Sequence, residues 1–115
     1  MCVLVLRTSA TWYFPNGRRE PGETEFAAAQ RETAEETGLA DLDFPFGDAH
    51  REALPAADGK VASYYLAETD EAEVQGARRK QHDEWRWVSF DEAEDLLPPR
   101  LALVLDWARA TIDGR

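Results

Sequence analysis

The sequence has few of the residues on which several protein classes depend. It contains a single cysteine, so no internal disulfide can form. Two histidines and one cysteine are too few to assemble an ordinary zinc cage easily. Only 13 lysines and arginines oppose 23 aspartates and glutamates, and the formal net charge of -10 argues against binding to duplex nucleic acid, which needs a basic surface. We therefore expect no disulfide framework, no zinc site and no nucleic-acid partner.

Long apolar segments are also absent. The longest runs, Cys2 to Leu6 and Leu101 to Leu105, fall far short of the roughly 20 residues that cross a bilayer. Met1 is not followed by a signal-peptide pattern. A chain of 115 residues that is 43% hydrophobic fits one compact domain. We expect a single domain over residues 1–115, in the cytoplasm and without membrane contact, with Cys2 buried and inert in a strand.

Three segments have the patterns of β-strands. Cys2 to Leu6 is a continuous apolar run, which is typical of a strand covered on both faces. Residues 61–66 form two alternating sets, as expected of a second strand, and a short third strand is expected around Trp85 to Val88. Trp85 and Trp87 alternate on that strand and so share a face. We interpret both as core residues.

Helices are predicted from capping signals and from helical spacing. The first extends from about Thr24 to Thr37, where Gly38 stops it. The second begins at Phe90, because Ser89 and Glu92 have capping-box spacing. A third follows two consecutive prolines, and its core positions recur at helical spacing: Leu101, Val104, Leu105, Ala108 and Ile112. This mixture of strands and helices predicts an α/β (α+β) domain.

The first of these helices carries three glutamates that converge. Residues three and four apart share a helix face, so Glu32 lies beside both Glu35 and Glu36. Adjacent like charges destabilise a helix unless they face water or hold a cation. Oxygen donors alone favour magnesium or manganese over zinc. By itself the cluster is open to two interpretations, a solvated helix face or a site for a divalent cation.

The segment before this helix is a loop suited to phosphate. Gly17 and Gly22 permit backbone conformations that are closed to other residues, and Pro15 and Pro21 stiffen the path. Exposed amides in such a loop can approach phosphate oxygens closely. Loop and acidic helix together therefore indicate one site for metal and phosphate.

The pattern from Gly17 to Leu39 resembles the signature of the Nudix hydrolases, G-x5-E-x7-R-E-U-x-E-E-x-G-U, in which U is aliphatic. The fixed positions are matched by Gly17, Glu23, Arg31, Glu32, Glu35, Glu36, Gly38 and Leu39. Thr33 departs from the pattern, a change that weakens local packing but removes no chemistry. The resemblance implies a mixed β-sheet sandwiched between helices. That fold normally begins with a strand before the one at Cys2 to Leu6, so we expect either a truncated start or a smaller sheet.

The resemblance also implies which residues carry the chemistry. In this family the last glutamates of the motif bind the metals, here Glu36 most securely and Glu35 next. Glu32 would be a further ligand or the base that deprotonates the attacking water. The main-chain carbonyl of Asn16, just before the first glycine, corresponds to a metal ligand in relatives. The bound magnesium or manganese would neutralise phosphate charge and acidify the water.

Other positions are expected to support the site or to complete it. Glu23 and Arg31 resemble the pair that pins loop to helix in this family, and Gly17 and Gly38 belong to the same supporting frame. Relatives usually carry a late glutamate in the loop before the final strand. That position holds Gln81 here, which leaves Asp83 or Glu84 as substitutes.

The downstream half of the chain gives a weaker indication of substrate. The segments "HREAL", "DGKVASYYLAE" and "HDEWRWVSFDEAEDLL" resemble asymmetric diadenosine tetraphosphate hydrolases. Such a substrate needs an aromatic surface for a base and cations for phosphates. Tyr64 or Tyr65 could supply the ring, with core packing as the alternative. Cations that could reach phosphates, unless they are merely solvated, are Lys60, His50 and Arg51. The basic run Arg78, Arg79 and Lys80 is interpreted as a solvated loop, with a substrate clamp as the alternative.

The resemblance therefore implies an enzyme whose partner is a small-molecule nucleotide. The expected reaction is metal-dependent hydrolysis of a phosphoanhydride bond in a nucleoside diphosphate-linked substrate, preferably diadenosine tetraphosphate cut asymmetrically to ATP and AMP. One alternative is the hydrolysis of oxidised nucleoside triphosphates. Another is a nucleotide sensor without turnover, which the three intact glutamates disfavour and Gln81 favours. The sequence leaves the oligomeric state open.

Overall fold

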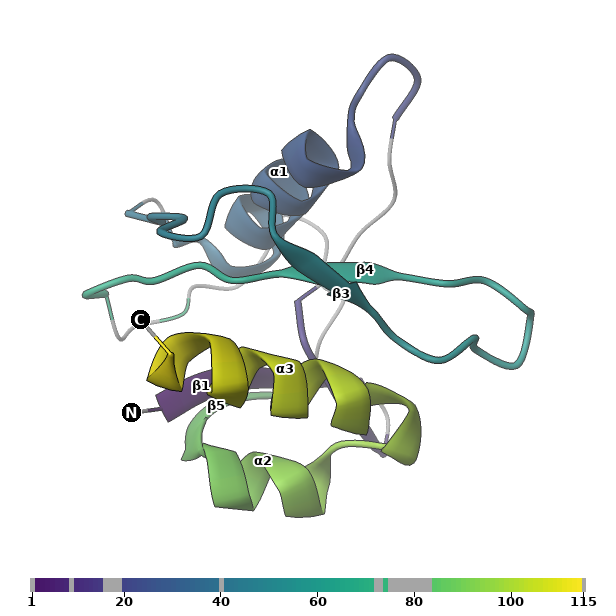
Figure 1. Ribbon diagram of the computed structural model, residues 1–115, viewed down its shortest axis with the longest axis vertical. Helices are drawn as coiled ribbons and strands as arrows, with labels where there is room; N and C mark the ends of the chain where they lie inside the picture. Colours follow the sequence, from purple (N-terminus) through teal and green to yellow (C-terminus); the bar gives the residue numbers. More distant parts are fainter. Residues whose placement is uncertain are drawn as a thin grey trace.

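A computed structural model describes residues 2–8, 10–15, 20–39, 41–71, 74 and 84–114 of the chain. The chain folds into both strands and helices, and the strand pairs are antiparallel, which confirms the α+β class (Figure 1). In chain order the elements are β1 (Cys2–Thr8), β2 (Thr11–Tyr13), α1 (Glu25–Thr37), β3 (His50–Glu52), β4 (Ser63–Tyr65), β5 (Glu84–Ser89), α2 (Phe90–Leu96), the 3-10 turn η1 (Pro99–Leu101) and α3 (Ala102–Asp113).

The strands form two small sheets. One has the order β2-β1-β5, with Leu6 of β1 paired to Tyr13 of β2 and to Trp85 of β5. The other consists of β3 and β4, with His50 paired to Tyr65. Every strand pair within the described residues is antiparallel, whereas the sequence led us to expect one mixed sheet.

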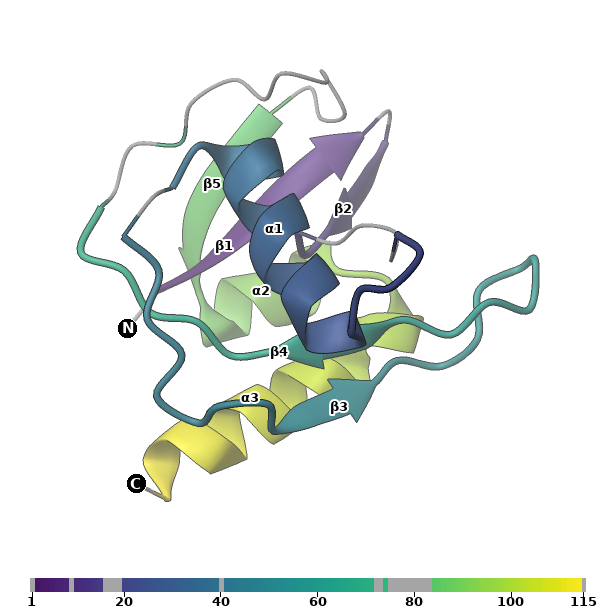
Figure 2. The same ribbon diagram turned by 90° about the horizontal axis from the view of Figure 1, so that it is seen from above.

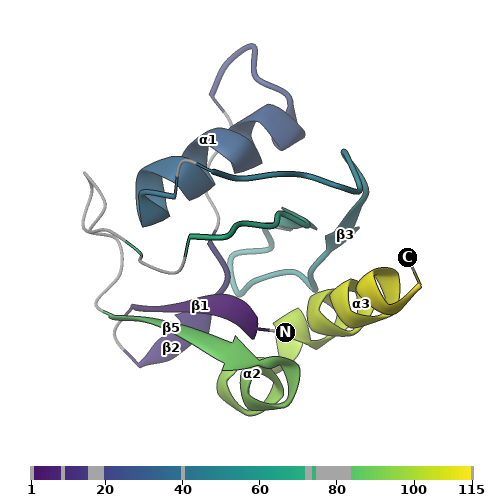
Figure 3. The same cartoon turned by 90° about the vertical axis from the view of Figure 1, so that its left-hand side faces the viewer.

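Helices cover both faces of the larger sheet. Figure 3 shows α1 on one side of β1 and β5 and α2 on the other, and Figure 2 shows α1 lying across β1. Because side chains alternate along a strand, Leu4 and Leu6 pack in one apolar cluster with Leu39, just after α1. Val5 packs in the other cluster, with residues of α2 and α3 such as Ala93. The sheet β3-β4 lies between α1 and α3 (Figure 1).

The helix boundaries follow the capping signals. Thr24 is the N-cap of α1, and its hydroxyl accepts a hydrogen bond from the N–H of Ala27 at 3.1 Å. Gly38 ends the helix with a φ of 72°, a left-handed conformation that glycine adopts without strain. Ser89 and Glu92 form the reciprocal capping box of α2. The predicted start and end of α1 and the predicted start of α2 are therefore confirmed.

The strand predictions are confirmed only in part. The segments Cys2–Thr8 and Glu84–Ser89 contain the predicted first and third strands, and β4 is shorter than the predicted second strand. The three-residue strands β2 and β3 were not predicted. Neither is long enough for an alternating pattern, and every residue of β3 is exposed.

Two expectations about burial are wrong. Cys2 is exposed, because β1 enters the core only from Leu4 onward. Trp85 is 39% exposed although its partner Leu6 is fully buried, because β5 is an outer strand of the sheet as described. Trp87 does pack against the cluster that contains Leu4. In the described part of the chain, no helix combines the length and apolar character required to span a bilayer.

Candidate active site

The glutamate cluster (Glu32, Glu35 and Glu36) lies in the second half of α1, and two of its members are buried. Glu32 is 5% exposed and Glu36 is 3% exposed, whereas Glu35 is half-buried. A solvated helix face therefore does not describe this cluster. Burying a carboxylate is costly unless it is paired or hydrogen-bonded, so each buried glutamate needs a partner.

Arg31 is the partner of Glu32 and Glu35. Its Nη1 lies 2.7 Å from Oε1 of Glu32 and 3.3 Å from Oε2 of Glu35. The other side of the guanidinium makes a bidentate contact with Glu23, with Nε at 2.7 Å from Oε2 and Nη2 at 2.9 Å from Oε1. Glu20 approaches the same guanidinium at 3.8 Å. Within the part of the chain that the structure describes, one positive charge thus sits among four carboxylates, which leaves an excess of negative charge there.

The Glu23–Arg31 ion pair joins the segment before α1 to the helix. Glu23 closes a turn with Glu20, whose N–H donates to Oε1 of Glu23 at 2.8 Å. The hydrogen bond from Arg31 lowers the pKa of Glu23 to about 2, and the bonds to Glu23 and then Glu32 raise the pKa of Arg31. The motif positions Asn16 and Gly17 lie outside the described residues.

This pairing predicts an acid-dependent part of the stability. Because Glu23 titrates near 2 in the folded chain and near 4.5 when unfolded, its contribution is present above about pH 4.5 and is lost as the pH falls toward 2. Glu23→Gln keeps the shape but removes the charge, so its Tm should fall less than that of the wild type over this window. Thermal denaturation of both proteins between pH 6 and about pH 2 measures the difference. If the Tm of the variant and that of the wild type fall in parallel as the pH is lowered, the prediction is contradicted.

Glu36 has a different partner, which the sequence did not indicate. The hydroxyl of Tyr13 donates to Oε1 of Glu36 at 3.2 Å, and the hydroxyl of Thr8 lies 3.1 Å from that of Tyr13. Tyr13 is on β2 and Thr8 ends β1, so this contact joins the larger sheet to the last turn of α1. The contact depends on the pairing of β2 with β1, which the sequence pattern does not predict. The sequence signal for it is weak: Tyr13 lies just before the loop that leads to α1.

The donor set fits a hard divalent cation. The cluster offers only carboxylate oxygens, which magnesium and manganese prefer. Among the described residues, acidic, histidine and cysteine side chains do not converge in groups of three as metal ligands do. Arg31 holds Glu32 and Glu35 while Tyr13 holds Glu36. The fit therefore rests on the buried oxygen donors and their excess negative charge, not on a preformed coordination shell.

The two candidate tyrosines have different environments. Tyr64 is 6% exposed, lies in the core with α3 and makes an edge contact with Phe14 at 5.9 Å between ring centroids. Tyr65 is half-buried, with its ring 5.0 Å from Phe26 of α1 and 5.3 Å from His50. Burial and then nearby acidic groups raise the pKa of Tyr65. These positions favour core packing for Tyr64 and leave Tyr65 as the candidate platform for a base.

The candidate phosphate-binding cations are not all brought to the helix. Arg51 lies on β3 and Lys60 in the connection from β3 to β4, and both are exposed. The sheet meets α1 near its first turn, where Ser63 donates to Glu25 at 3.2 Å. The structure thus brings Tyr65 toward α1 and leaves Arg51 and Lys60 in solvent. Arg78, Arg79 and Lys80 lie outside the described residues.

Glu84 is placed on the other face of the sheet. It is paired with Arg7 across the strands, and its carboxylate lies 3.1 Å from Arg7 and 3.0 Å from Arg86. Its neighbour Trp85 pairs with Leu6 on the face toward α1, so Glu84 points to the face that α2 covers. This position does not support a catalytic role for Glu84. The alternative positions, Gln81 and Asp83, lie outside the described residues.

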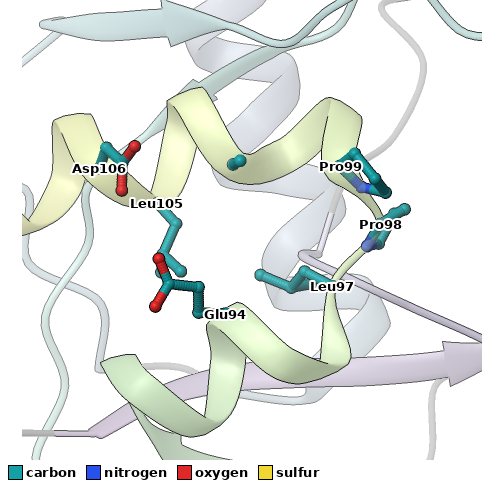
Figure 4. Close-up of a pocket in the computed structure, with 7 residues that line it drawn as sticks. Glu94, Leu97, Pro98, Pro99, Leu105 and Asp106 are labelled. Atoms are coloured by element: carbon teal, nitrogen blue, oxygen red, sulfur yellow. The ribbon is translucent and has the colours of Figure 1, made fainter.

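A pocket lies between α2 and α3 (Figure 4), and its lining includes no residue of α1, the helix that carries the glutamate cluster. Glu94 and Asp106 lie at its rim, and Leu97, Pro98 and Leu105 are among its lining residues. Its volume of about 120 Å³ is small beside the ~300 to 1,000 Å³ of typical small-molecule sites. This pocket is therefore not the candidate site for a nucleotide.

Comparison with known proteins points to one family. The family model described as NUDIX domain matches residues 2–108 of the chain. A pig protein named bis(5'-nucleosyl)-tetraphosphatase (asymmetrical) is 33% identical over 85 residues, which cover 71% of this chain. The chain spans only 58% of the length of that curated relative.

Structural and local matches add to this comparison. The crystal structure of a C. elegans Ap4A hydrolase binary complex is 29% identical, with a TM-score of 0.84, over 99% of this chain and 88% of that chain. A mouse protein named 8-oxo-dGDP phosphatase NUDT18 is 66% identical over 29 residues, which cover 25% of this chain and 9% of that protein.

Proposed function

Because the chain belongs to the Nudix family, we propose that it is a pyrophosphohydrolase that requires magnesium or manganese and acts on a dinucleoside polyphosphate. The family model covers residues 2–108, which include the whole motif. The preferred substrate is diadenosine tetraphosphate. Water would attack one phosphorus atom and the P–O bond of the neighbouring anhydride would break, which gives ATP and AMP.

One observation carries the proposal: two carboxylates of the motif are almost fully buried on the same helix face. Glu32 and Glu36 are 5% and 3% exposed, and among the described residues the guanidinium of Arg31 faces more carboxylates than one positive charge can neutralise. Such an arrangement is unfavourable for stability by itself, because like charges repel more strongly when sheltered from water. A bound divalent cation would offset this repulsion.

The residues of this chain have separate tasks in the proposed reaction. Glu35 and Glu36 would hold the metal, with the carbonyl of Asn16, and Glu32 would be a further ligand or the base that takes the proton of the water. A divalent metal at this position would acidify the water and stabilise the charge that develops on the phosphate. Arg31 fixes the carboxylate of Glu32 at 2.7 Å, so the base would keep one orientation throughout.

The choice of a dinucleotide rests on relatives and on one aromatic residue. The names of the pig and C. elegans proteins specify tetraphosphate-linked nucleosides. In this chain Tyr65 offers a half-buried ring close to α1, beside Phe26 and His50. A base bound there would contribute binding energy remote from the scissile bond, which can orient the phosphate chain.

The test is a product-resolved assay of a nucleotide panel with millimolar magnesium and with EDTA. Diadenosine tetraphosphate should be hydrolysed with a higher kcat/KM than ATP, and ATP and AMP should be the products. EDTA should abolish the hydrolysis of diadenosine tetraphosphate and of ATP. Two molecules of ADP as products, or full activity in EDTA, would contradict the proposal.

The alternative of an enzyme for oxidised nucleotides has one observation in its favour. The mouse relative with 66% identity over 29 residues is named for action on 8-oxo-dGDP. Faster hydrolysis of an 8-oxo-guanine nucleotide than of any dinucleotide in the same panel would select this alternative. Absence of turnover on every nucleotide would instead favour a sensor.

A further inference from the structure

We propose that Tyr13 is a positioning residue for Glu36 and that Thr8 acts through it. These three side chains form a relay from the sheet to the helix, defined here as the Thr8–Tyr13–Glu36 relay. The proposal deepens the proposed function and rests on it, because it takes Glu36 as a metal ligand. Neither Tyr13 nor Thr8 belongs to the sequence motif from Gly17 to Leu39.

The direction of the two hydrogen bonds follows from the number of available protons. An ionised carboxylate only accepts hydrogen bonds, so at 3.2 Å Tyr13 must donate its single hydroxyl proton to Oε1 of Glu36. Tyr13 then acts as the acceptor for the hydroxyl of Thr8 at 3.1 Å. The contact from Thr8 thus commits the tyrosine proton to Glu36. A tyrosine without that neighbour could turn its proton elsewhere.

The relay is attached to regular secondary structure at both ends. Tyr13 is paired with Leu6, which is fully buried, and Thr8 is paired with Thr11 in the same antiparallel register. Glu36 lies in the last turn of α1, next to the fully buried Thr37. The sheet therefore sets the position of the tyrosine hydroxyl, and α1 sets the backbone position from which the Glu36 side chain reaches it.

A fixed carboxylate affects metal affinity. Hydrogen bonds to ligating side chains orient them and tune their basicity, and their loss typically lowers metal affinity or activity by about 10- to 100-fold. Arg31 orients Glu32 and Glu35, whereas the relay orients Glu36. Each buried carboxylate of the cluster is thus held by its own donor. The relay would determine how well Glu36 is prepared for the metal.

The experiment measures the dissociation constant of Mn²⁺ from the signal of free Mn²⁺ in electron paramagnetic resonance. Tyr13→Phe keeps the ring and removes the hydroxyl, and its Mn²⁺ affinity should be lower by about 10-fold or more. Thr8→Val, which removes the hydroxyl, should cause a smaller loss of Mn²⁺ affinity. Thr8→Ser, which keeps a hydroxyl, should bind Mn²⁺ nearly as tightly as the wild type. Thr11→Val is the matched control, because Thr11 is the exposed threonine that pairs with Thr8, and it should bind Mn²⁺ like the wild type.

A double-mutant cycle separates the relay from a general effect on stability. If Thr8 acts through Tyr13, the double variant with Thr8→Val and Tyr13→Phe should bind Mn²⁺ as weakly as Tyr13→Phe alone. If the fold loss of Mn²⁺ affinity in the double variant equals the product of the two single losses, the relay is overturned. Wild-type Mn²⁺ affinity in Tyr13→Phe would also overturn it. A variant that lowers the metal-free Tm but not the affinity would point to packing and would also overturn it.

Failure of the proposed function has a different signature. If the wild type hydrolyses no nucleotide in the panel but the Thr8 and Tyr13 variants still bind Mn²⁺ more weakly than the wild type, the enzymatic function is refuted and the relay is supported. A wild type that binds no Mn²⁺ would refute the metal site and the relay together. Both results come from the same purified proteins.

Discussion

Replacing Glu36 with glutamine is expected to lower kcat at least about a hundredfold, which corresponds to a barrier higher by roughly 2.7 kcal/mol. The change keeps the size of the side chain and an oxygen that can accept from Tyr13, so the fold should be retained. It removes one negative charge from a buried group of like charges, and the metal-free protein should be as stable as the wild type or more stable. Single-turnover and steady-state assays with saturating magnesium and diadenosine tetraphosphate measure the effect.

The control for this variant is Glu94→Gln, the same chemical change on the exposed surface of α2. Its kcat should stay within about twofold of the wild type, since it lies at the pocket between α2 and α3 and not in the glutamate cluster. Magnesium should raise the Tm of the wild type and of the control by mass action, and raise that of Glu36→Gln much less. Wild-type turnover in Glu36→Gln would show that the most secure position of the motif has been misassigned.

Replacing Tyr64 with alanine is expected to lower the free energy of unfolding by about 3 kcal/mol, in the range for truncating a large buried aromatic residue. Tyr64 is 6% exposed and packs with Phe14 and with the cluster that includes Leu101 and Leu105. For a chain of this size such a loss lowers the Tm by roughly 10 °C. Urea and thermal denaturation measure it, and kcat/KM of the folded protein at low temperature should change little.

Tyr65→Ala is the matched comparison on the same strand. Tyr65 faces Phe26 and His50 instead of the core, so this variant should lose less stability. If its ring binds a base, kcat/KM for the dinucleotide should fall by an amount equivalent to about 1 to 3 kcal/mol, whereas kcat/KM for ATP should fall less. The reverse pattern, with Tyr64→Ala defective in specificity and Tyr65→Ala unstable, would reverse the two assignments.

The sequence predicted those parts of the fold that depend on neighbouring residues. The ends of α1 follow from a threonine cap and a left-handed glycine, both of which act within one helical turn. The same holds for the capping box at Ser89 and for the helical spacing that places Glu32 and Glu36 one turn apart on α1. These features require no knowledge of the rest of the chain. The convergence of all three glutamates that the spacing predicted is not observed in the described residues.

Other features depend on which distant segments meet, and sequence patterns carry little of that information. The contact between Tyr13 and Glu36 spans 23 positions of sequence and exists because β2 pairs with β1 in one register. The exposure of Trp85 depends on its place in an outer strand. Alternation placed Tyr64 and Tyr65 on opposite faces, but only the packing of α1 and α3 distinguishes the core residue from the accessible one.

The exposure of Cys2 offers a spectroscopic use. It is the only thiol in the sequence, and it lies at the opposite end of β1 from Thr8. A nitroxide attached to it would therefore label one position, at the start of a seven-residue strand that spans roughly 20 Å. Pulsed measurements between that nitroxide and bound Mn²⁺ would give one metal-to-strand distance in solution. Because β1 is central in its sheet as described, that distance would restrict the position of the ion relative to the sheet that carries Tyr13.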